Sequence, residues 1–404
     1  MAINLEQGPW KTEHWWVSHF NFTESVRENF HLSGSVALHD STLRDGEQAA
    51  GVVFSKEQKI EIAKMLDRAG VQYIEAGFPA VSANDQEALA AVCAAGLKAK
   101  ITCLCRAMEK DIDLAKQCGV WGAIIEIPVS YPRLKYQFGW EEDAVIDKAL
   151  RTAAYAREQG LHTSLFLIDS TRARLEFLER MLTTVVPKAE VGKVVMVDTN
   201  GVIHPAGMKY LVRKAKEWVD VPIEVHCHND FGLGVANSLA GVEEGAASVS
   251  CTLNGLGQRA GNTATEEVAL ALECLYGIDT GIDFAALYQV AQRVREISGW
   301  SFPPNKPVVG DNLFTWEAGI PTAAMMKNPH TVEPFQPELF GRKHDVKLGK
   351  KSGKANIEWK LRELNLQLSQ ELVEKALALV KEEAVRLQRT LTDEEFMRIV
   401  ESLS

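Results

Sequence analysis

The chain has 404 residues, of which 46% are hydrophobic and 24% charged, so it can bury a barrel-sized core and carry a smaller appended region. Its formal net charge of -10 argues against general binding to nucleic acids or anionic membranes, because both need clustered Lys and Arg side chains. No stretch reaches the roughly 18 apolar residues of a transmembrane helix, and the start of the chain has no apolar signal-peptide core. The seven cysteines include no C-x-x-C pair, a pattern typical of reduced thiols in a cytoplasmic protein.

The first 35 residues precede any alternating pattern and are rich in Trp and Phe, with aromatic side chains at positions 10, 15, 16, 20, 22 and 30. Such density is typical of an arm that packs against its own barrel or against a partner subunit. We therefore expect an N-terminal arm over residues 1–35. We also expect a homodimer, because neither this arm nor the helical segment after residue 290 looks able to bury its apolar face alone.

From Val36 onward, short β-branched runs alternate with longer amphipathic ones, which is the pattern of parallel βα units. Between the short runs lie helical patterns, such as the one that follows the N-cap candidate Ser55 and ends at Gly70. Eight runs are candidate strands: residues 36–40, 72–77, 99–104, 122–128, 162–168, 193–198, 223–228 and 247–253. Because eight parallel strands close a TIM barrel, the sequence predicts an α/β fold with a TIM (β/α)8 barrel over residues 36–290.

The α/β alternation stops after about residue 290. Residues 301–307 (SFPPNKP) mark a linker, so we expect a linker or subdomain over residues 291–353. Residues 354–404 have the pattern of small helices with charged outer faces, including residues 369–387. The sequence therefore predicts a small, mostly helical C-terminal region.

Side chains that can bind a divalent metal follow three of the predicted strands. Asp45 comes just after the first strand, at the C-terminal mouth where barrel enzymes place their sites. A lone barrel histidine is usually a structural residue, whereas His226 and His228 are two apart at a strand end, so both rings face the same side. Asn262 follows the eighth strand and can add an oxygen ligand. This mixed set with open positions suits Mg²⁺, Mn²⁺, Co²⁺ or Zn²⁺ and indicates catalysis.

Three segments far apart in the chain together resemble one family. They are residues 40–48 (DSTLRDGEQ), 226–230 (HCHND) and 255–262 (GLGQRAGN). The combination resembles the α-isopropylmalate synthases and homocitrate synthases, and runs at residues 275–283, 307–320 and 348–353 are similar to nitrogenase-type homocitrate synthases. The resemblance covers roughly residues 36–350. It implies an acyltransferase that condenses acetyl-CoA, or another acyl-CoA, with a 2-oxo acid on a barrel-bound metal, held at the positions of Asp45, His226, His228 and Asn262.

The resemblance also implies roles in substrate binding and catalysis. Arg44 matches an arginine beside the substrate carbonyl, where a cation stabilises developing negative charge. Thr199 matches a threonine that hydrogen-bonds the carboxylate of the 2-oxo acid. Arg106 is a further candidate to bind a carboxylate, with a structural ion pair as the alternative. Glu75 and Phe78 resemble the site wall of the isopropylmalate synthases.

Two departures from the family affect proton transfer. Relatives carry a Glu-Asp pair after the fifth strand, where this chain has Ile168 and Asp169, and a linker histidine where it has Pro321. Those missing residues are thought to help deprotonate the acetyl-CoA methyl group, and the lack of a positioned base costs about 10²–10⁴-fold in rate. Either another residue substitutes, with Asp169, Tyr131 and His330 as the candidates, or the donor needs no deprotonation.

Three functions follow from this pattern. The first is a metal-dependent condensing enzyme with a displaced base, and the second is a lyase or aldolase that acts on a related hydroxy acid. The third is a non-catalytic paralogue that binds a 2-oxo acid, which the complete metal set with Arg44 and Thr199 disfavours. Because Ile168 and Pro321 stand at the positions of the usual base, we expect little wash-out of deuterium from trideuterated acetyl-CoA. Exchange at an ordinary enzymatic rate would instead show that a replacement base is present.

Overall fold

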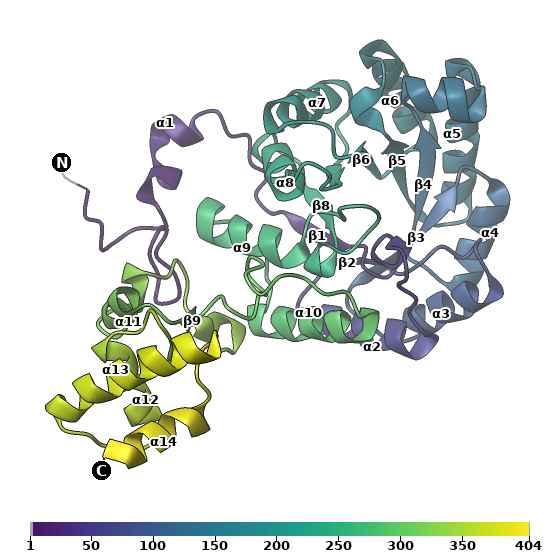
Figure 1. The fold of residues 1–404 in the computed structure, drawn as a ribbon. Helices are drawn as coiled ribbons and strands as arrows, with labels where there is room; N and C mark the ends of the chain where they lie inside the picture. The colour runs from purple at the N-terminus through teal and green to yellow at the C-terminus, as the bar shows by residue number, and fades with distance from the viewer. Residues whose placement is uncertain (1–2, 404) are drawn as a thin grey trace. The chain divides into compact units, whose positions relative to one another are not determined.

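The computed structural model describes residues 3–403, which form two compact units (Figure 1). One unit, the barrel unit, runs from Phe20 to Ser301. The other, the terminal unit, combines the chain up to His19 with the chain from Phe302 onward. The division of the chain that was predicted from the sequence stays a prediction; its ranges are residues 1–35, 36–290, 291–353 and 354–404. Within residues 3–403, no helix is both long and apolar enough to cross a membrane.

The barrel unit contains eight parallel strands that close in chain order, with the last paired to the first. This confirms the predicted TIM barrel, and the ends of the strands lie within two residues of those expected. The strands are β1 (Ala37–Asp40), β2 (Tyr73–Glu75), β3 (Lys100–Arg106), β4 (Gly122–Pro128), β5 (His162–Ile168), β6 (Lys193–Asp198), β7 (Ile223–Cys227) and β8 (Ser248–Cys251).

Helices surround these strands, as Figure 1 shows for α5, α6 and α7. Ser55 caps α2 as predicted, because its side chain accepts a hydrogen bond from the backbone N–H of Gln58 and the Gln58 side chain bonds back to Ser55. The helices of this unit are α1 (Glu24–Arg27), α2 (Lys56–Arg68), α3 (Ala83–Cys93), α4 (Glu109–Cys118), α5 (Glu142–Glu158), α6 (Leu175–Ala189), α7 (Pro205–Trp218), α8 (Gly234–Glu243), α9 (Thr265–Tyr276) and α10 (Phe284–Ser298).

Near the amino-terminal ends of β6, β7 and β8, the barrel interior holds a buried polar group of residues that we call the lower network. Glu224 is its centre: its carboxylate accepts from Lys193 Nζ at 2.5 Å and from Ser248 Oγ at 2.7 Å, and lies 3.0 Å from His39 Nδ1. The other ring nitrogen of His39 lies 2.8 Å from Thr102 Oγ1. Because Lys193 and His39 surround it, the pKa of Glu224 is held well below its usual range although burial alone would raise it.

Above the lower network, an apolar layer fills the barrel. It consists of Leu104, Ile124, Phe166, Val195 and Val197, with Phe78 and Ile168 packed against it. These residues come from adjacent strands whose register places their side chains on one face. The layer separates the lower network from the carboxyl ends of the strands, which we call the mouth.

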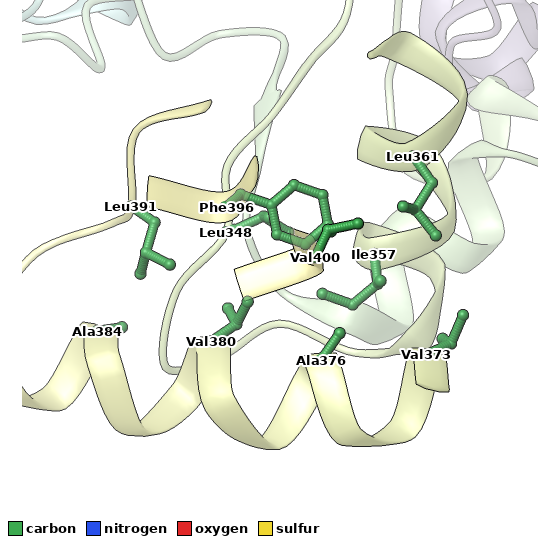
Figure 2. Close-up of a cluster of buried hydrophobic side chains, with 10 residues drawn as sticks. All are labelled: Leu348, Ile357, Leu361, Val373, Ala376, Val380, Ala384, Leu391, Phe396 and Val400. Atoms are coloured by element: carbon green, nitrogen blue, oxygen red, sulfur yellow. The ribbon is translucent and has the colours of Figure 1, made fainter. Parts of the chain in front are cut away.

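The terminal unit is mostly helical after residue 353, as predicted. Ser369 caps α13 (Gln370–Leu387) by accepting a hydrogen bond from the backbone N–H of Leu372. Figure 2 shows the buried cluster that holds α12 (Lys354–Glu363), α13 and α14 (Asp393–Leu403) together. The cluster consists of Leu348, Ile357, Leu361, Val373, Ala376, Val380, Ala384, Leu391, Phe396 and Val400.

The remaining elements of the terminal unit are short. A parallel pair joins β9 (Thr315–Trp316) to β10 (Asp345–Val346), and α11 (Gly319–Met325) contains Pro321. The aromatic start of the chain packs within this unit: the Trp16 ring meets the His330 ring edge-on, with 6.2 Å between centroids.

Candidate metal-centred active site

Three of the predicted metal ligands lie together at the mouth of the barrel. Asp45 Oδ2 is 3.1 Å from His226 Nε2 and 3.7 Å from His228 Nε2. The three ligand atoms all lie within 4.8 Å of one another, and all three residues are buried. His226 lies in β7 and His228 follows directly after its end. A tight turn after β1 brings Asp45 beside them, with the N–H of Gly46 donating to Ser41 O at 3.0 Å. The chain therefore brings an N/N/O set together, as the spacing predicted.

The hydrogen bonds behind this cluster engage the Nδ1 atoms, so both Nε2 atoms face Asp45. His228 Nδ1 donates to the carbonyl of Gly261 at 3.1 Å, and His226 Nδ1 lies 2.8 Å from Ser250 Oγ. Burial lowers the pKa of His228 to about 4, so its imidazole is neutral at pH 7. Burial opposes the ionisation of Asp45, but Arg44 and the two histidines hold the pKa of this carboxyl far below its usual range. A neutral imidazole and an ionised carboxylate are the forms that bind a metal.

Asn262, the fourth predicted ligand, has a buried oxygen, Oδ1, without a hydrogen-bond partner among the described residues. Its side chain is buried, and Nδ2 donates to Leu256 O at 3.1 Å. Asn262 also forms a backbone bridge with His228, which fixes it beside the cluster. Because a buried carbonyl oxygen without a partner costs free energy, this oxygen fits the role of a further metal ligand.

The glycine-rich turn before Asn262 is too crowded for side chains. A Cβ added at Gly257 would collide with Nδ2 of Asn262, and one added at Gly261 would collide with the carbonyl of Gly255. Gly261 also has a φ of 82°, in the left-handed region that favours glycine. The turn therefore sets the position of the Asn262 side chain.

Arg44 is held rigidly beside the metal cluster. Its Nε and Nη2 donate to the two oxygens of Glu75 at 2.6 and 2.9 Å, and its Nη1 lies 3.6 Å from Asp45 Oδ2. Burial would lower the pKa of Arg44, but Glu75 and Asp45 raise it above its usual value, so the guanidinium stays charged. Both Glu75 oxygens are engaged by Arg44 and by Ser41 Oγ. Glu75, predicted to bind substrate, thus contacts Arg44 and orients it.

The two other residues predicted to bind substrate have different surroundings. Thr199 Oγ1 accepts from the backbone N–H of Asp169 at 2.8 Å, which leaves its hydroxyl hydrogen to donate elsewhere. Arg106 forms a fork with Asp111, with Nε–Oδ2 at 2.8 Å and Nη2–Oδ1 at 2.9 Å. This is the structural ion pair that the sequence left open as an alternative.

Each candidate for the replacement base is already engaged. Asp169 is fully buried and accepts from Arg172, with Nη2–Oδ2 at 2.7 Å and Nε–Oδ1 at 2.9 Å. Tyr131 is 51% exposed, and its hydroxyl accepts from Lys135 Nζ at 2.8 Å. His330 belongs to the terminal unit, where Nδ1 lies 3.3 Å from Gln336 Nε2.

One acidic side chain at the mouth was missed by the sequence analysis. Glu126 lies in β4, in register with Arg106 of β3 and Phe166 of β5. Burial raises the pKa of its carboxyl, against the opposing effect of Arg44. The signal that could have found it is a single charge inside the apolar run 123–129 (AIIEIPV), on the same face of the strand as Ile124.

A cavity of about 460 Å³ opens beside Arg44, between the segments that follow β1 and β2. Phe78 and Phe54 line it together with Arg44. The carboxylates of Glu47 and Asp85 line it as well, so the cavity offers both apolar and charged contacts to a ligand.

Comparison with known proteins gives concordant matches. The HMGL-like family model matches residues 35–294, and the model described as homocitrate synthase post-HMGL domain-like matches residues 308–388. The chain is 44% identical over 380 residues to homocitrate synthase AksA of Methanopyrus kandleri, covering 94% of this chain and 95% of that protein. It is 42% identical over 345 residues to 2-isopropylmalate synthase of Methanocaldococcus jannaschii, and this match covers 85% of this chain and 66% of that protein.

Among solved structures, the HMG-CoA lyase of Bacillus subtilis matches with a TM-score of 0.60 at 20% sequence identity. The match covers 68% of this chain and 97% of the lyase. At this identity the likeness supports the barrel fold alone.

Proposed function

We infer the activity from the family: the chain belongs to the HMGL-like family and continues into a homocitrate synthase post-HMGL domain-like segment, and we propose that it condenses acetyl-CoA, or another acyl-CoA, with a 2-oxo acid. Relatives named as homocitrate synthase and 2-isopropylmalate synthase favour this reaction over the lyase alternative. The observation that carries the proposal is the buried cluster of Asp45, His226 and His228 with the guanidinium of Arg44 beside it.

The residues at the mouth fit a divalent metal. Asp45, His226 and His228 would hold it, and the unpaired Oδ1 of Asn262 would add an oxygen ligand. The donor set is compatible with Mg²⁺, Mn²⁺, Co²⁺ or Zn²⁺. When bound, such an ion polarises the keto group of a 2-oxo acid and neutralises part of its charge.

The side chains of this site have separate roles in the proposed reaction. The guanidinium of Arg44, held by Glu75, stabilises the negative charge that develops on the keto oxygen as the new C–C bond forms. The hydroxyl of Thr199 donates to the carboxylate of the 2-oxo acid, because its oxygen already accepts from Asp169. The cavity beside Arg44, which has both apolar and charged side chains in its lining, gives room for the acyl donor.

A substrate screen tests this proposal. The purified protein is assayed with a series of 2-oxo acids, with and without acetyl-CoA, and the free CoA thiol is measured. We expect thiol release that requires both a divalent metal and one class of 2-oxo acid. Cleavage of a hydroxy acid in the absence of any acyl-CoA, without thiol release in the other assays, would instead identify a lyase.

We also propose that the chain forms a homodimer. The support is the aromatic arm together with exposed apolar side chains in the terminal unit, such as Ile320, which is 88% exposed in the single chain. Light scattering at micromolar protein is expected to give the mass of two chains. The mass of one chain would contradict the proposal.

A further inference from the structure

Condensation requires a base, and the residue at which the family resemblance implies one, Ile168, is apolar. Ile168 packs against the apolar layer of the barrel with Phe78. The carboxylate next to it, Asp169, is neutralised by Arg172. A thioester α-proton is a very weak acid, so the proposed reaction needs another proton acceptor at the mouth.

Glu126 lies near the carboxyl end of β4, in register with Phe166 of β5. Its register partner Phe166 has its ring edge-on to the His226 ring, with 5.2 Å between centroids, and the guanidinium of Arg44 lies 5.9 Å from the same ring. Register partners on parallel strands point to the same face and lie about 4.8 Å apart. Ile124, two residues before Glu126, belongs to the apolar layer inside the barrel. The Glu126 carboxyl therefore points into the barrel, toward the mouth and one strand away from the residue that contacts both Arg44 and His226.

Glu126 differs from the neighbouring carboxylates because no arginine forms an ion pair with it. Glu75 is held by Arg44, Asp111 by Arg106 and Asp169 by Arg172. Glu126 forms no hydrogen bond or ion pair within residues 3–403. A partly buried carboxylate without a hydrogen bond or ion pair destabilises a fold, and such groups are found where function requires them.

The charges that face Glu126 come from every adjacent element. Arg44 after β1, Arg106 on β3 and Arg133 after β4 favour its ionised form, whereas Glu75 on β2 disfavours it. The neighbour on β5, Phe166, is uncharged. Burial outweighs the arginines and raises the pKa of Glu126, which makes its carboxylate a stronger base than an exposed one.

We propose that Glu126 is the catalytic base that removes a proton from the methyl group of acetyl-CoA, in place of the residue lost at Ile168. The assignment rests on the proposed condensation. The C–H bond of the methyl group breaks, its proton goes to a carboxylate oxygen of Glu126, and its electron pair forms the enolate of the thioester. The enolate carbon then bonds to the keto carbon of the 2-oxo acid, and the keto oxygen takes up the negative charge beside Arg44. The alkoxide takes a proton from solvent, and water then hydrolyses the thioester, which releases the CoA thiol and leaves a carboxylate. Glu126 returns its proton to solvent before the next turnover.

Deuterium wash-out from trideuterated acetyl-CoA tests the assignment in the metal-loaded protein with its 2-oxo acid. We expect Glu126→Gln to lose about 10²–10⁴-fold in both wash-out and thiol release, while the affinity for the 2-oxo acid changes less than about threefold. Glu126→Asp is expected to recover part of the wash-out rate that Glu126→Gln loses. It should also shift the acidic side of the plot of wash-out rate against pH. The control is Glu158→Gln, on the exposed side of α5.

A stability measurement separates catalysis from structure. Because Glu126→Gln removes an unpaired carboxylate, we expect its thermal unfolding temperature to equal or exceed that of the parent protein. Wash-out in Glu126→Gln above a tenth of the parent rate would overturn the base assignment and leave the condensation proposal standing. Absence of thiol release from the parent protein with every 2-oxo acid would overturn the condensation, and the base assignment with it.

Discussion

The two ends of the barrel interior use similar side chains in opposite ways. In the lower network, the Glu224 carboxylate is surrounded by His39, Lys193 and Ser248, so its charge is fully compensated. At the mouth, Asn262 Oδ1 has no partner among the described residues, and the carboxylate of Glu126 has none either. The apolar layer keeps the two ends apart. The lower end therefore stabilises the fold, whereas the mouth leaves polar atoms unpaired, as expected of the end where barrel enzymes place their sites.

The largest effect is expected when both histidines at the mouth are replaced by alanine. His226→Ala with His228→Ala should abolish stoichiometric metal binding and lower the activity by roughly 10⁴-fold, since a Lewis acid supplies several kcal/mol of transition-state stabilisation. Metal content by elemental analysis and thiol release measure the two effects. The control is the exposed His31→Ala. Full metal content in the double variant would refute the ligand assignment.

A change in the lower network should affect stability and leave the metal in place. Glu224→Gln leaves Lys193 buried without its counter-charge, so we expect the free energy of unfolding to fall by about 3–5 kcal/mol. Urea unfolding measures this loss, and metal content per folded chain should stay unchanged. Adding Lys193→Met should recover much of the stability. No recovery would show that the charge of Lys193 is not the cause.

Two serines of β8 allow the mouth and the lower network to be compared with the same substitution, Ser→Ala. Ser250 contacts His226 at the mouth, whereas Ser248 contacts Glu224 in the lower network. Ser250→Ala should lower metal affinity about 10–100-fold, measured by competition with a chelator, because it removes the group that orients a ligand. Ser248→Ala should instead lower the free energy of unfolding by about 1 kcal/mol with unchanged metal affinity. Equal effects of the two variants would contradict the division of the barrel.

The smallest effect is a pH dependence at the amino-terminal end of β5. Burial, together with Lys193 and Lys100, lowers the pKa of His162 to about 4. The unfolded chain takes up this proton near pH 6.5, so the folded state loses stability as the pH falls from about 6.5 to about 4, by on the order of 1 kcal/mol for this partly exposed ring. His162→Phe, which can still stack on Trp121, should remove this part of the pH dependence. Urea unfolding at pH 7 and pH 5 measures it, and an unchanged slope would contradict the assignment.

The sequence was sufficient to predict the barrel and the close approach of Asp45, His226 and His228 for physical reasons. Buried parallel strands form short β-branched runs, and the two-residue spacing of His226 and His228 fixes their common face whatever the rest of the chain does. Both predictions depend on local periodicity and on where a strand ends.

The missed features depend on contacts between distant segments. Asp169 has a left-handed φ of 63° and turns its carboxylate toward Arg172, so its availability as a base could not be judged from its position after the strand. Glu126 occurs in an apolar run and carries no motif. Its importance appears only when the register places it between Arg106 and Phe166 and when the neighbouring acids prove to be occupied.

The glycine turn before Asn262 has a consequence for protein engineering. In a saturation mutagenesis library, substitutions at Gly257 and Gly261 should score as badly as substitutions of the ligands themselves, because any β-carbon there displaces Asn262 or distorts the turn that holds it. A designer who reads such a map as a list of substrate contacts would assign both glycines to the wrong class. Growth on limiting and on excess metal would distinguish the classes, since a displaced ligand weakens metal retention and excess metal can compensate for that loss.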